Sequence, residues 1–366
     1  MPLTDIDGAR LDDSAFYAGK NLIINGAMQV AQRATSVTGV TSSGYRAVDR
    51  FRPSMGTLGT WTIEQSTDAP DGYAYSHKFT CTTADASPAA GDDIEMEFRV
   101  EAQDLQHLNY GSASAQTMTL SFWVKSNKTG TATVNILQPD NSNKSLSPTY
   151  TISSAGVWEH KTISIPGDTA GVISNDNGNG LHFLWWLNSG SNFTSGTNRT
   201  TWTTLDSADR NASNLGVGGA VNDYWQITGV QLEVGEVASA FEHRSYADDL
   251  RRCQRYYYKV TSPANGRNPF GICSGQNSTR AVAFVPFPVV MRTEPTAVEQ
   301  TGTASDYYIR LALSDVACNS VPSLQDRCTV SGAMLNCYVS SGLSAGYCGI
   351  FGSNTTDGYL AFSVEI

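Results

Sequence analysis

GVQLEVG, at residues 229–235, is the stretch that decides how this chain is organised. Val230, Leu232 and Val234 alternate with polar side chains, which is the period-two pattern of a half-buried β-strand. Two further stretches follow closely, AFEHRS at residues 240–245 and CQRYYY at 253–258. The strand is therefore expected to end in a tight connection near Gly235.

A short helix is expected after that connection. Ser245 stands three residues ahead of Asp248, which is the spacing of an N-terminal capping box. Leu250 and Cys253 then recur at helical spacing on one apolar stripe. The sequence predicts a helix over residues 245–255 followed by a new strand, and thus a hinge between two β domains.

The composition favours the same fold class. A chain of 366 residues can bury two ordinary cores. Only 16% of its residues are charged and 33 are glycine, which is typical of turn-rich β structure, while 40% hydrophobic residues are too many for a disordered chain. Short strands alternate with Gly, Asn, Asp and Ser turns. We expect an all-β protein, with an N-terminal jelly-roll β-sandwich joined by a short helix to a smaller C-terminal β-sandwich.

The expected boundaries follow from these patterns. Residues 1–20 are polar and mixed, and are expected to form an attachment arm that orders by docking on another protein. The jelly-roll domain is expected over residues 21–241, the hinge helix over 242–255 and the second sandwich over 256–366.

The motifs resemble those of a known family. NLIINGAMQVAQR at residues 21–33 and YRAVDRF at 45–51, together with the three stretches above, are similar to a signature of tail-fibre and other appendage proteins of tailed phages. Ala34 stands where that signature usually has Gly, and Phe51 where it usually has Trp. The resemblance implies a structural and adhesive virion protein, a fibre or spike that binds host cell-surface glycan. A capsid-mounted head fibre or decoration protein, and a non-viral carbohydrate-binding module, remain as alternatives.

The partners expected from this resemblance are other virion proteins, a host polysaccharide and further copies of the chain. A homotrimer is expected, because linked weak sugar sites gain about 10²–10⁴ in avidity and association around one axis covers strand edges. The net charge of −10 argues against nucleic-acid binding. The first residues lack the pattern of a signal peptide, and no run approaches the ~20 apolar residues of a membrane span. We expect assembly in the host cytoplasm and a place in the virion, without membrane insertion.

Residues for catalysis or metal binding are sparse. The five histidines are scattered without metal-ligand spacing, so neither an enzyme nor a cofactor is expected. An acidic row, Glu95, Glu97 and Glu101, lies on one face of a predicted strand and could suggest calcium or paired catalytic carboxylates. Arg99 interrupts the row, which favours a solvated strand face.

The cysteines show no zinc pattern either. Cys318, Cys328, Cys337 and Cys348 recur at intervals of about one strand and one turn, and no close pair exists among them. They are expected to be small buried hydrophobic residues on neighbouring strands. A disulfide that forms after release from the host is the alternative.

Aromatic residues are the best candidates for a ligand site. Trp123 is expected to lie opposite the apolar face of its strand, and Trp186 falls in a run that is apolar on both faces. Each could offer a flat ring to a sugar, or could serve core or subunit packing instead. Polar loops near the C-terminus add four tyrosines as stacking candidates, with core packing again as the alternative: Tyr308, Tyr338, Tyr347 and Tyr359.

One charged motif is expected to be structural. If residues 45–51 form a strand, Asp49 shares a face with Ala47 and Phe51 and is partly buried. A buried carboxylate needs a partner. We therefore expect loss of Asp49 to disturb folding rather than binding.

Overall fold

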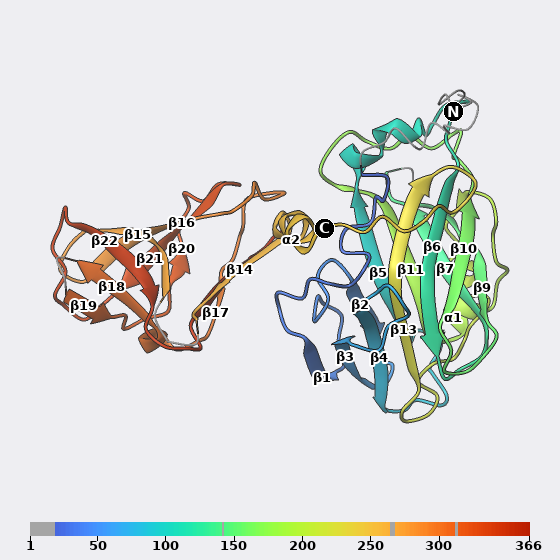
Figure 1. Ribbon diagram of the computed structural model, residues 1–366, viewed down its shortest axis with the longest axis horizontal. Coiled ribbons are helices and arrows are strands. Elements are labelled where there is room, and N and C mark those ends of the chain that lie inside the picture. Colours follow the sequence, from blue (N-terminus) through green and yellow to red (C-terminus); the bar gives the residue numbers. More distant parts are fainter. Residues whose placement is uncertain (1–18, 141–142, 264–267, 312–313) are drawn as a thin grey trace, which may run out of the picture. The chain divides into compact units, whose positions relative to one another are not determined.

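The computed structural model describes residues 19–140, 143–263, 268–311 and 314–366 and forms two compact units (Figure 1). Unit 1 comprises the described residues up to Asp249 together with Ile366, and unit 2 comprises Leu250–Glu365. Each unit is built from packed β-sheets, so the expectation of an all-β chain with two sandwiches is confirmed. The predicted arm lies outside the described residues except for Gly19 and Lys20.

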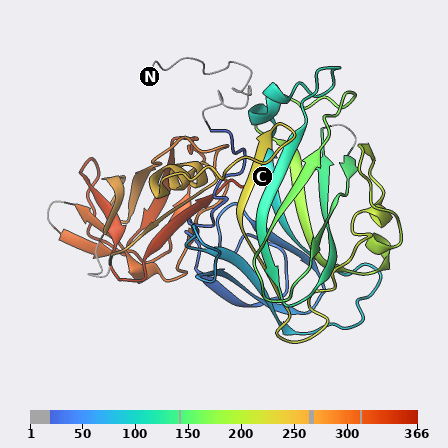
Figure 2. The same ribbon diagram turned by 45° about the vertical axis from the view of Figure 1, so that its right-hand side comes forward.

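Unit 1 is a sandwich of two antiparallel sheets (Figure 2). Sheet A has the spatial order β1 (Ser36–Val40), β3 (Thr60–Ser66), β4 (Ser76–Thr83), β13 (Tyr224–Val234), β6 (Met118–Ser126), β10 (Glu159–Ile165). Sheet B has the order β12 (Thr203–Thr204), β8 (Lys144–Leu146), β7 (Gly130–Gln138), β11 (Asn179–Ser189), β5 (Asp93–Glu101), β2 (Arg52–Gly56), and β9 (Thr149–Ile152) also pairs with β7. Alternate residues of each strand point inward and form one continuous core.

Short helical segments connect these strands. A 3₁₀ helix, η3 (Ala102–Leu108), follows β5. The connection from β11 to β13 contains a single helical turn, α1 (Ser191–Thr194), and a second 3₁₀ helix, η4 (Ser207–Asp209). Phe193 and Leu205 of this connection pack on a small cluster of buried residues on the outer face of sheet B, which includes Trp186. The connection therefore covers part of that face.

Residues 45–51 do not form the predicted strand. They run as turns, with Arg50 at a φ of 72°, and β2 begins only at Arg52. Asp49 is nevertheless buried, and its carboxylate accepts hydrogen bonds from the Gln32 backbone N–H (3.0 Å) and side-chain amide (2.5 Å). Arg33 lies 3.7 Å away. Asp49 thus joins the two parts of the N-terminal motif, and its burial comes from this turn rather than from strand alternation.

The predicted helix forms as α2 (Tyr246–Gln254). The Ser245 hydroxyl accepts a hydrogen bond from the Asp248 backbone N–H at 3.2 Å and donates one to the Asp248 carboxylate at 2.6 Å. These two contacts confirm the predicted cap. No helix in the described part of the chain is both long enough and apolar enough to cross a membrane.

Unit 2 packs a large sheet on a small one. The large sheet has the order β19 (Ser314–Ala317), β18 (Tyr307–Leu311), β22 (Cys348–Ser353), β15 (Asn268–Gly275), β16 (Arg280–Pro286), β21 (Gly332–Tyr338), β20 (Ser323–Leu324). The small sheet has the order β14 (Tyr257–Thr261), β23 (Tyr359–Ser363), β17 (Glu299–Gln300), and a 3₁₀ helix, η5 (Ala304–Asp306), precedes β18. Inward-facing residues of both sheets form its core.

The cysteines agree with the sequence expectation in part. Cys318 and Cys337 are buried in the core of unit 2, and Cys328 is half-buried against it. Cys348 is exposed, so the prediction of burial is wrong for this residue, which lies on the outer face of β22. All seven cysteines are free thiols in the structure.

Candidate functional site

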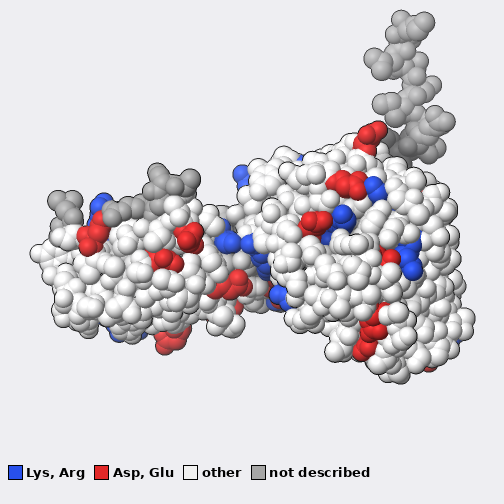
Figure 3. All heavy atoms as spheres, turned by 90° about the horizontal axis from the view of Figure 1, so that it is seen from below, with Lys and Arg blue, Asp and Glu red and all other residues white. Residues whose placement is uncertain are grey.

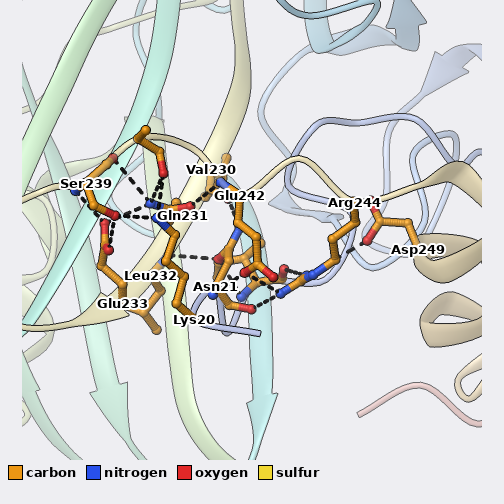
Figure 4. Close-up of polar contacts among 12 residues, drawn as sticks. Lys20, Asn21, Val230, Gln231, Leu232, Glu233, Ser239, Glu242, Arg244 and Asp249 are labelled. Atoms are coloured by element: carbon orange, nitrogen blue, oxygen red, sulfur yellow. Dashed lines mark hydrogen bonds and ion pairs between the residues drawn. The ribbon is translucent and has the colours of Figure 1, made fainter. Parts of the chain in front are cut away.

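The motif residues of unit 1 meet in one polar cluster at the end of β13 (Figure 4). Residues 21–26 run alongside β13, with backbone hydrogen bonds from Leu22 to Leu232 and from Val230 to Gly26, both at 2.9 Å. A Cβ atom at Gly26 would lie 2.1 Å from the Val230 carbonyl oxygen. Only glycine allows the two segments to approach so closely.

Asn21 is the centre of this polar cluster (Figure 4). Its side-chain amide donates to the Val230 carbonyl at 3.1 Å and accepts from the Leu232 backbone N–H at 3.0 Å. Its own backbone N–H donates to the Glu242 carboxylate at 2.7 Å. Arg244 donates to the carbonyls of Asn21 and Ile23 and lies 3.9 Å from Asp249.

The polar side chains of β13 are also engaged. The segment after β13 folds back over its outer face, where the Ser239 hydroxyl and backbone N–H both donate to Glu233. Gln231 donates to Glu233 and accepts from the Glu242 backbone N–H, each at 2.8 Å. Gln231 and Glu233 are buried, although strand alternation predicts an exposed polar face. The cluster is therefore structural: it fastens both ends of unit 1 to one strand.

Next to this cluster, sheet A carries an aromatic patch, which we define as Tyr73, Trp123, Trp158, His160, Phe241 and His243. The Trp123 and His160 rings lie 5.2 Å apart across the β6–β10 pair. The Tyr73 ring lies 5.2 Å from Phe241 and 5.4 Å from His243. Phe241 in turn lies 4.9 Å from His243. Trp123 keeps part of its ring exposed, and His160 is exposed.

Gly229 of the opening motif allows this arrangement. It lies at a φ of 61°, at a register shift between β13 and β6. A Cβ atom there would lie 2.7 Å from Tyr73 and 3.0 Å from Trp123. The missing side chain lets both rings lie against β13, and the left-handed backbone favours glycine further.

Polar groups border the aromatic patch at one end. The Asp68 carboxylate accepts hydrogen bonds from Lys125 (2.8 Å), Gln226 (2.8 Å) and the Trp158 indole (3.2 Å). Burial acts to raise the pKa of Asp68, but these donors outweigh it and hold that pKa below its ordinary value. Burial, and then Lys161, lower the pKa of His160. At neutral pH the patch therefore combines flat rings with one fixed carboxylate and a largely uncharged His160.

The two predicted tryptophans have different positions. Trp123 lies in the patch and is partly exposed. Trp186 is completely buried, because Phe193 packs on it at 5.2 Å and Arg210 covers its ring at 4.9 Å. Its ring does not reach solvent, so Trp186 is not a direct contact for a ligand in this structure. Tyr73, Phe241 and His243 were not anticipated, because they lie in loops whose approach to Trp123 depends on tertiary structure.

The four predicted tyrosines of unit 2 also differ in their exposure to solvent. Tyr338 and Tyr347 are 40% and 55% exposed. Tyr308 is buried in β18, and Tyr359 is half-buried with Lys259 above its ring at 4.6 Å. Only Tyr338 and Tyr347 therefore present open rings.

The acidic row of β5 is not the solvated face that its sequence suggests. Glu95, Glu97 and Glu101 are each 5% exposed or less. Glu97 pairs with Arg52 at 2.7 Å and Arg99 at 3.1 Å. Burial acts to raise the pKa of Glu97, but His182 and the two arginines outweigh it and bring that pKa to about 2.

Glu95 shows the opposite shift. Burial, and then the nearby Asp93 and Glu97, raise the pKa of Glu95 well above its ordinary value. One Glu95 carboxyl oxygen has no hydrogen-bond partner. Within the described residues, no group of three or more His, Cys, Asp or Glu side chains is arranged to hold a metal ion. The acidic row is thus a buried charge network in which the pKa of Glu95 is raised and that of Glu97 is lowered.

Charged residues are sparse on the surface. On the face drawn in Figure 3, Lys, Arg, Asp and Glu form small groups on a mainly uncharged surface.

Comparison with solved structures gives distant likenesses. No family model and no curated protein matches the sequence. The tailspike protein 4 enzymatically active domain of bacteriophage CBA120 is similar over 59% of this chain and 22% of its own, at 11% identity and a TM-score of 0.32. A family 22 carbohydrate-binding module of Clostridium thermocellum is similar over 61% of this chain and 99% of its own, at 10% identity and a TM-score of 0.30. A family 61 module solved with β-1,4-galactotriose is similar over 59% and 99%, at 10% identity and a TM-score of 0.29. At these scores neither ligand nor activity is carried over to this chain.

Proposed function

We propose that this chain is a structural and adhesive virion protein of a tailed phage, and that the aromatic patch of unit 1 binds host cell-surface glycan. The observation that carries the proposal is the partly exposed ring of Trp123, which lies 5.2 Å from His160 and packs with Tyr73 against Gly229. Sugar rings stack their apolar faces on such rings, while nearby polar groups accept and donate hydrogen bonds to hydroxyls. Asp68 and Lys125 supply those groups at the border of the patch.

The test compares single substitutions in the full chain. Trp123→Ala removes the stacking face, and we expect about a tenfold weaker binding to host surface polysaccharide, or about 1.4 kcal/mol. Trp123→Phe should keep part of the affinity, because an aromatic face remains. Tyr347→Ala serves as the matched control in unit 2. If Tyr347→Ala abolishes binding while Trp123→Ala does not, the glycan site lies in the C-terminal loops instead.

The homotrimer belongs to the same proposal, and the outer face of the large sheet of unit 2 supports it. Ile350, Ile272, Phe284 and Met334 form one apolar row across β22, β15, β16 and β21. Ile272 is 68% exposed and Phe284 is 37% exposed. The charged pair Arg310–Asp315 lies towards one edge of this face. An apolar centre with a polar rim is the usual anatomy of a protein interface, and we assign a second copy of this chain as its occupant.

This part of the proposal is tested by the mass of the particle in solution. Light scattering at micromolar concentration should give three chains for the unmodified protein. Ile272→Asp places a charge in the apolar row, and a monomer with intact β structure is the expected result. Thr279→Asp, at an exposed turn outside the row, is the control. A monomeric unmodified protein would refute the trimer.

Placement in the virion needs a separate test. Antibodies against unit 1 should label intact phage particles, and their position separates a tail fibre from a head fibre or decoration protein. Absence of the chain from purified particles would favour a non-viral carbohydrate-binding module. We propose no catalytic role, because the carboxylates of β5 are buried in the charge network described above.

A further inference from the structure

A pocket in unit 1, formed by other residues than the aromatic patch, has the features of a sugar site. It lies between α1 and η4, in the connection that covers the outer face of sheet B, and has a volume of about 550 Å³. Pockets for small ligands commonly measure about 300–1,000 Å³. Its lining contains one aromatic ring among small polar residues: Ser191, Asn192, Phe193, Ser195, Asp206, Ser207. We refer to it as the Phe193 pocket.

The ring of Phe193 is held from below. Trp186 lies 5.2 Å from it at an interplanar angle of 41°, and the Arg210 guanidinium lies 5.6 Å from its centroid. Arg210 also covers Trp186 and donates to the Asn135 side chain at 3.3 Å. These contacts fix the ring while Phe193 remains partly exposed. Buried Trp186 is therefore a positioning residue for the aromatic floor of this pocket.

The backbone of the pocket is also fixed. Gly196 donates to the Ala208 carbonyl at 2.9 Å, which joins the end of α1 to η4. The Asp206 carboxylate accepts the Ala208 backbone N–H at 3.0 Å through one oxygen. Thr197 and Arg199 both donate to the buried Asp209 below. These hydrogen bonds hold α1 and η4, the two sides of the pocket, at a fixed separation.

The polar groups that line the pocket remain available. The side chains of Ser191, Asn192, Ser195 and Ser207 make no hydrogen bond to any described residue, and all four residues are exposed. Asp206 keeps its second carboxylate oxygen for a ligand. An amide, a carboxylate and several hydroxyls around one ring match the alternating hydroxyls and the apolar face of a sugar.

We propose that the Phe193 pocket is a second glycan-binding site and that it takes an uncharged hexose residue. The charge of the site decides the class of sugar, because Asp206 is the acidic residue in the lining and disfavours a carboxylated sugar. The cation that contacts Phe193, Arg210, lies behind that ring and already contacts Trp186 and Asn135, while Arg199 pairs with Asp209. The inference rests on the proposed function in that it adds a second site to a glycan-binding chain, but it depends on different residues.

The experiment isolates the pocket in the full chain that carries Trp123→Ala, which removes the stacking face of the aromatic patch. Maltotriose, cellotriose and β-1,4-galactotriose are the neutral probes, trigalacturonate is the charged probe, and binding is measured by calorimetric titration. At least one neutral probe should bind, and trigalacturonate should bind at least tenfold more weakly. Adding Phe193→Ala or Asn192→Ala should lower the affinity by tenfold or more. Asn192 is exposed, so its loss leaves the fold intact. Thr200→Ala, exposed in the same connection outside the pocket, should change nothing.

Each outcome separates the two proposals. If neutral probes bind the unmodified chain but not the Trp123→Ala chain, and Asn192→Ala has no effect, the pocket is not a site while the aromatic patch stands. If Asn192→Ala abolishes binding of the neutral probes and Trp123→Ala leaves host polysaccharide binding unchanged, the pocket stands and the patch fails. Preference for trigalacturonate overturns the assignment to uncharged sugars. If none of the three neutral probes binds the Trp123→Ala chain, the proposal for the Phe193 pocket is wrong. The proposal for the aromatic patch is tested separately, by the effect of Trp123→Ala on binding of host polysaccharide.

Discussion

The two units differ in how far the outer faces of their sheets are covered. In unit 1 the outer face of β13 is covered by the same chain, and its polar side chains Gln231 and Glu233 are buried in hydrogen bonds. In unit 2 the outer face of the large sheet stays open, with Ile272 and Phe284 exposed. The difference shows that unit 1 covers this face with its own chain, whereas unit 2 leaves an apolar surface exposed, where we propose that another copy binds. Each of the following experiments tests one side of that contrast.

Asp49→Ala has the largest expected effect, and it should act on unit 1 alone. The substitution leaves the Gln32 side chain and the Arg33 guanidinium without a buried carboxylate. Breaking such a buried pair costs about 3–5 kcal/mol. Differential scanning calorimetry should show one transition moved to much lower temperature while the transition of unit 2 remains. Asp326→Ala, exposed in unit 2, is the control. A folded Asp49→Ala protein that only loses glycan binding would make Asp49 a site residue.

Gly229→Ala should come next, with an expected cost of about 2–3 kcal/mol from the left-handed backbone and overpacking against two rings. The added methyl group meets Tyr73 and Trp123. Glycan affinity should fall together with stability, because the rings must move. Gly72→Ala is the control, since it also has a positive φ but nothing lies near its Cβ position. Equal effects of the two substitutions would show that backbone strain alone explains the loss.

Acid should weaken unit 1 by an amount on the order of 2 kcal/mol. The pKa of Glu97 is about 2 in the fold and lies below its ordinary value, so its ion pairs stabilise the fold above an ordinary pKa of 4.5. This contribution is lost as the pH falls from about 4.5 towards 2. Urea unfolding at a series of pH values should show the loss, and Glu97→Gln should remove most of it. An unchanged pH profile in that variant would assign the acid sensitivity to other groups.

Cysteine labelling has the smallest expected effect on the fold and tests unit 2. Cys348 is exposed on the apolar face, whereas burial raises the pKa of Cys318 to about 12 and that of Cys273 to about 11. A maleimide should therefore modify Cys348 first in the monomeric Ile272→Asp protein. In the unmodified protein, which we propose to be a trimer, this reaction should be at least tenfold slower, because the partner would cover the thiol. Equal rates in both proteins would place the subunit contact elsewhere.

The sequence predicts local structure in this chain better than surface exposure. The strand at Val230 and the cap at Ser245 depend on neighbouring residues, and both predictions are confirmed. The sequence pattern places Glu95 and Gln231 on exposed strand faces and leaves the environment of Trp186 open. All three side chains are buried in the structure. Their burial depends on segments that arrive from distant parts of the chain, and period-two alternation carries no information about such covering segments. The candidate site was accessible to sequence reasoning through Trp123 alone for the same reason.

The polar cluster around Asn21 has a mechanical consequence. Lys20 bonds to Ser239 and to the Ala240 carbonyl, while Arg244 bonds to the Asn21 and Ile23 carbonyls, so the chain enters and leaves the sandwich at one point. A pulling force between the residues before Lys20 and those after Arg244 is then carried by these short cross-links. The strands of sheets A and B lie outside that path and bear little of the tension. Tension applied between these two ends should therefore leave the sandwich of unit 1 closed.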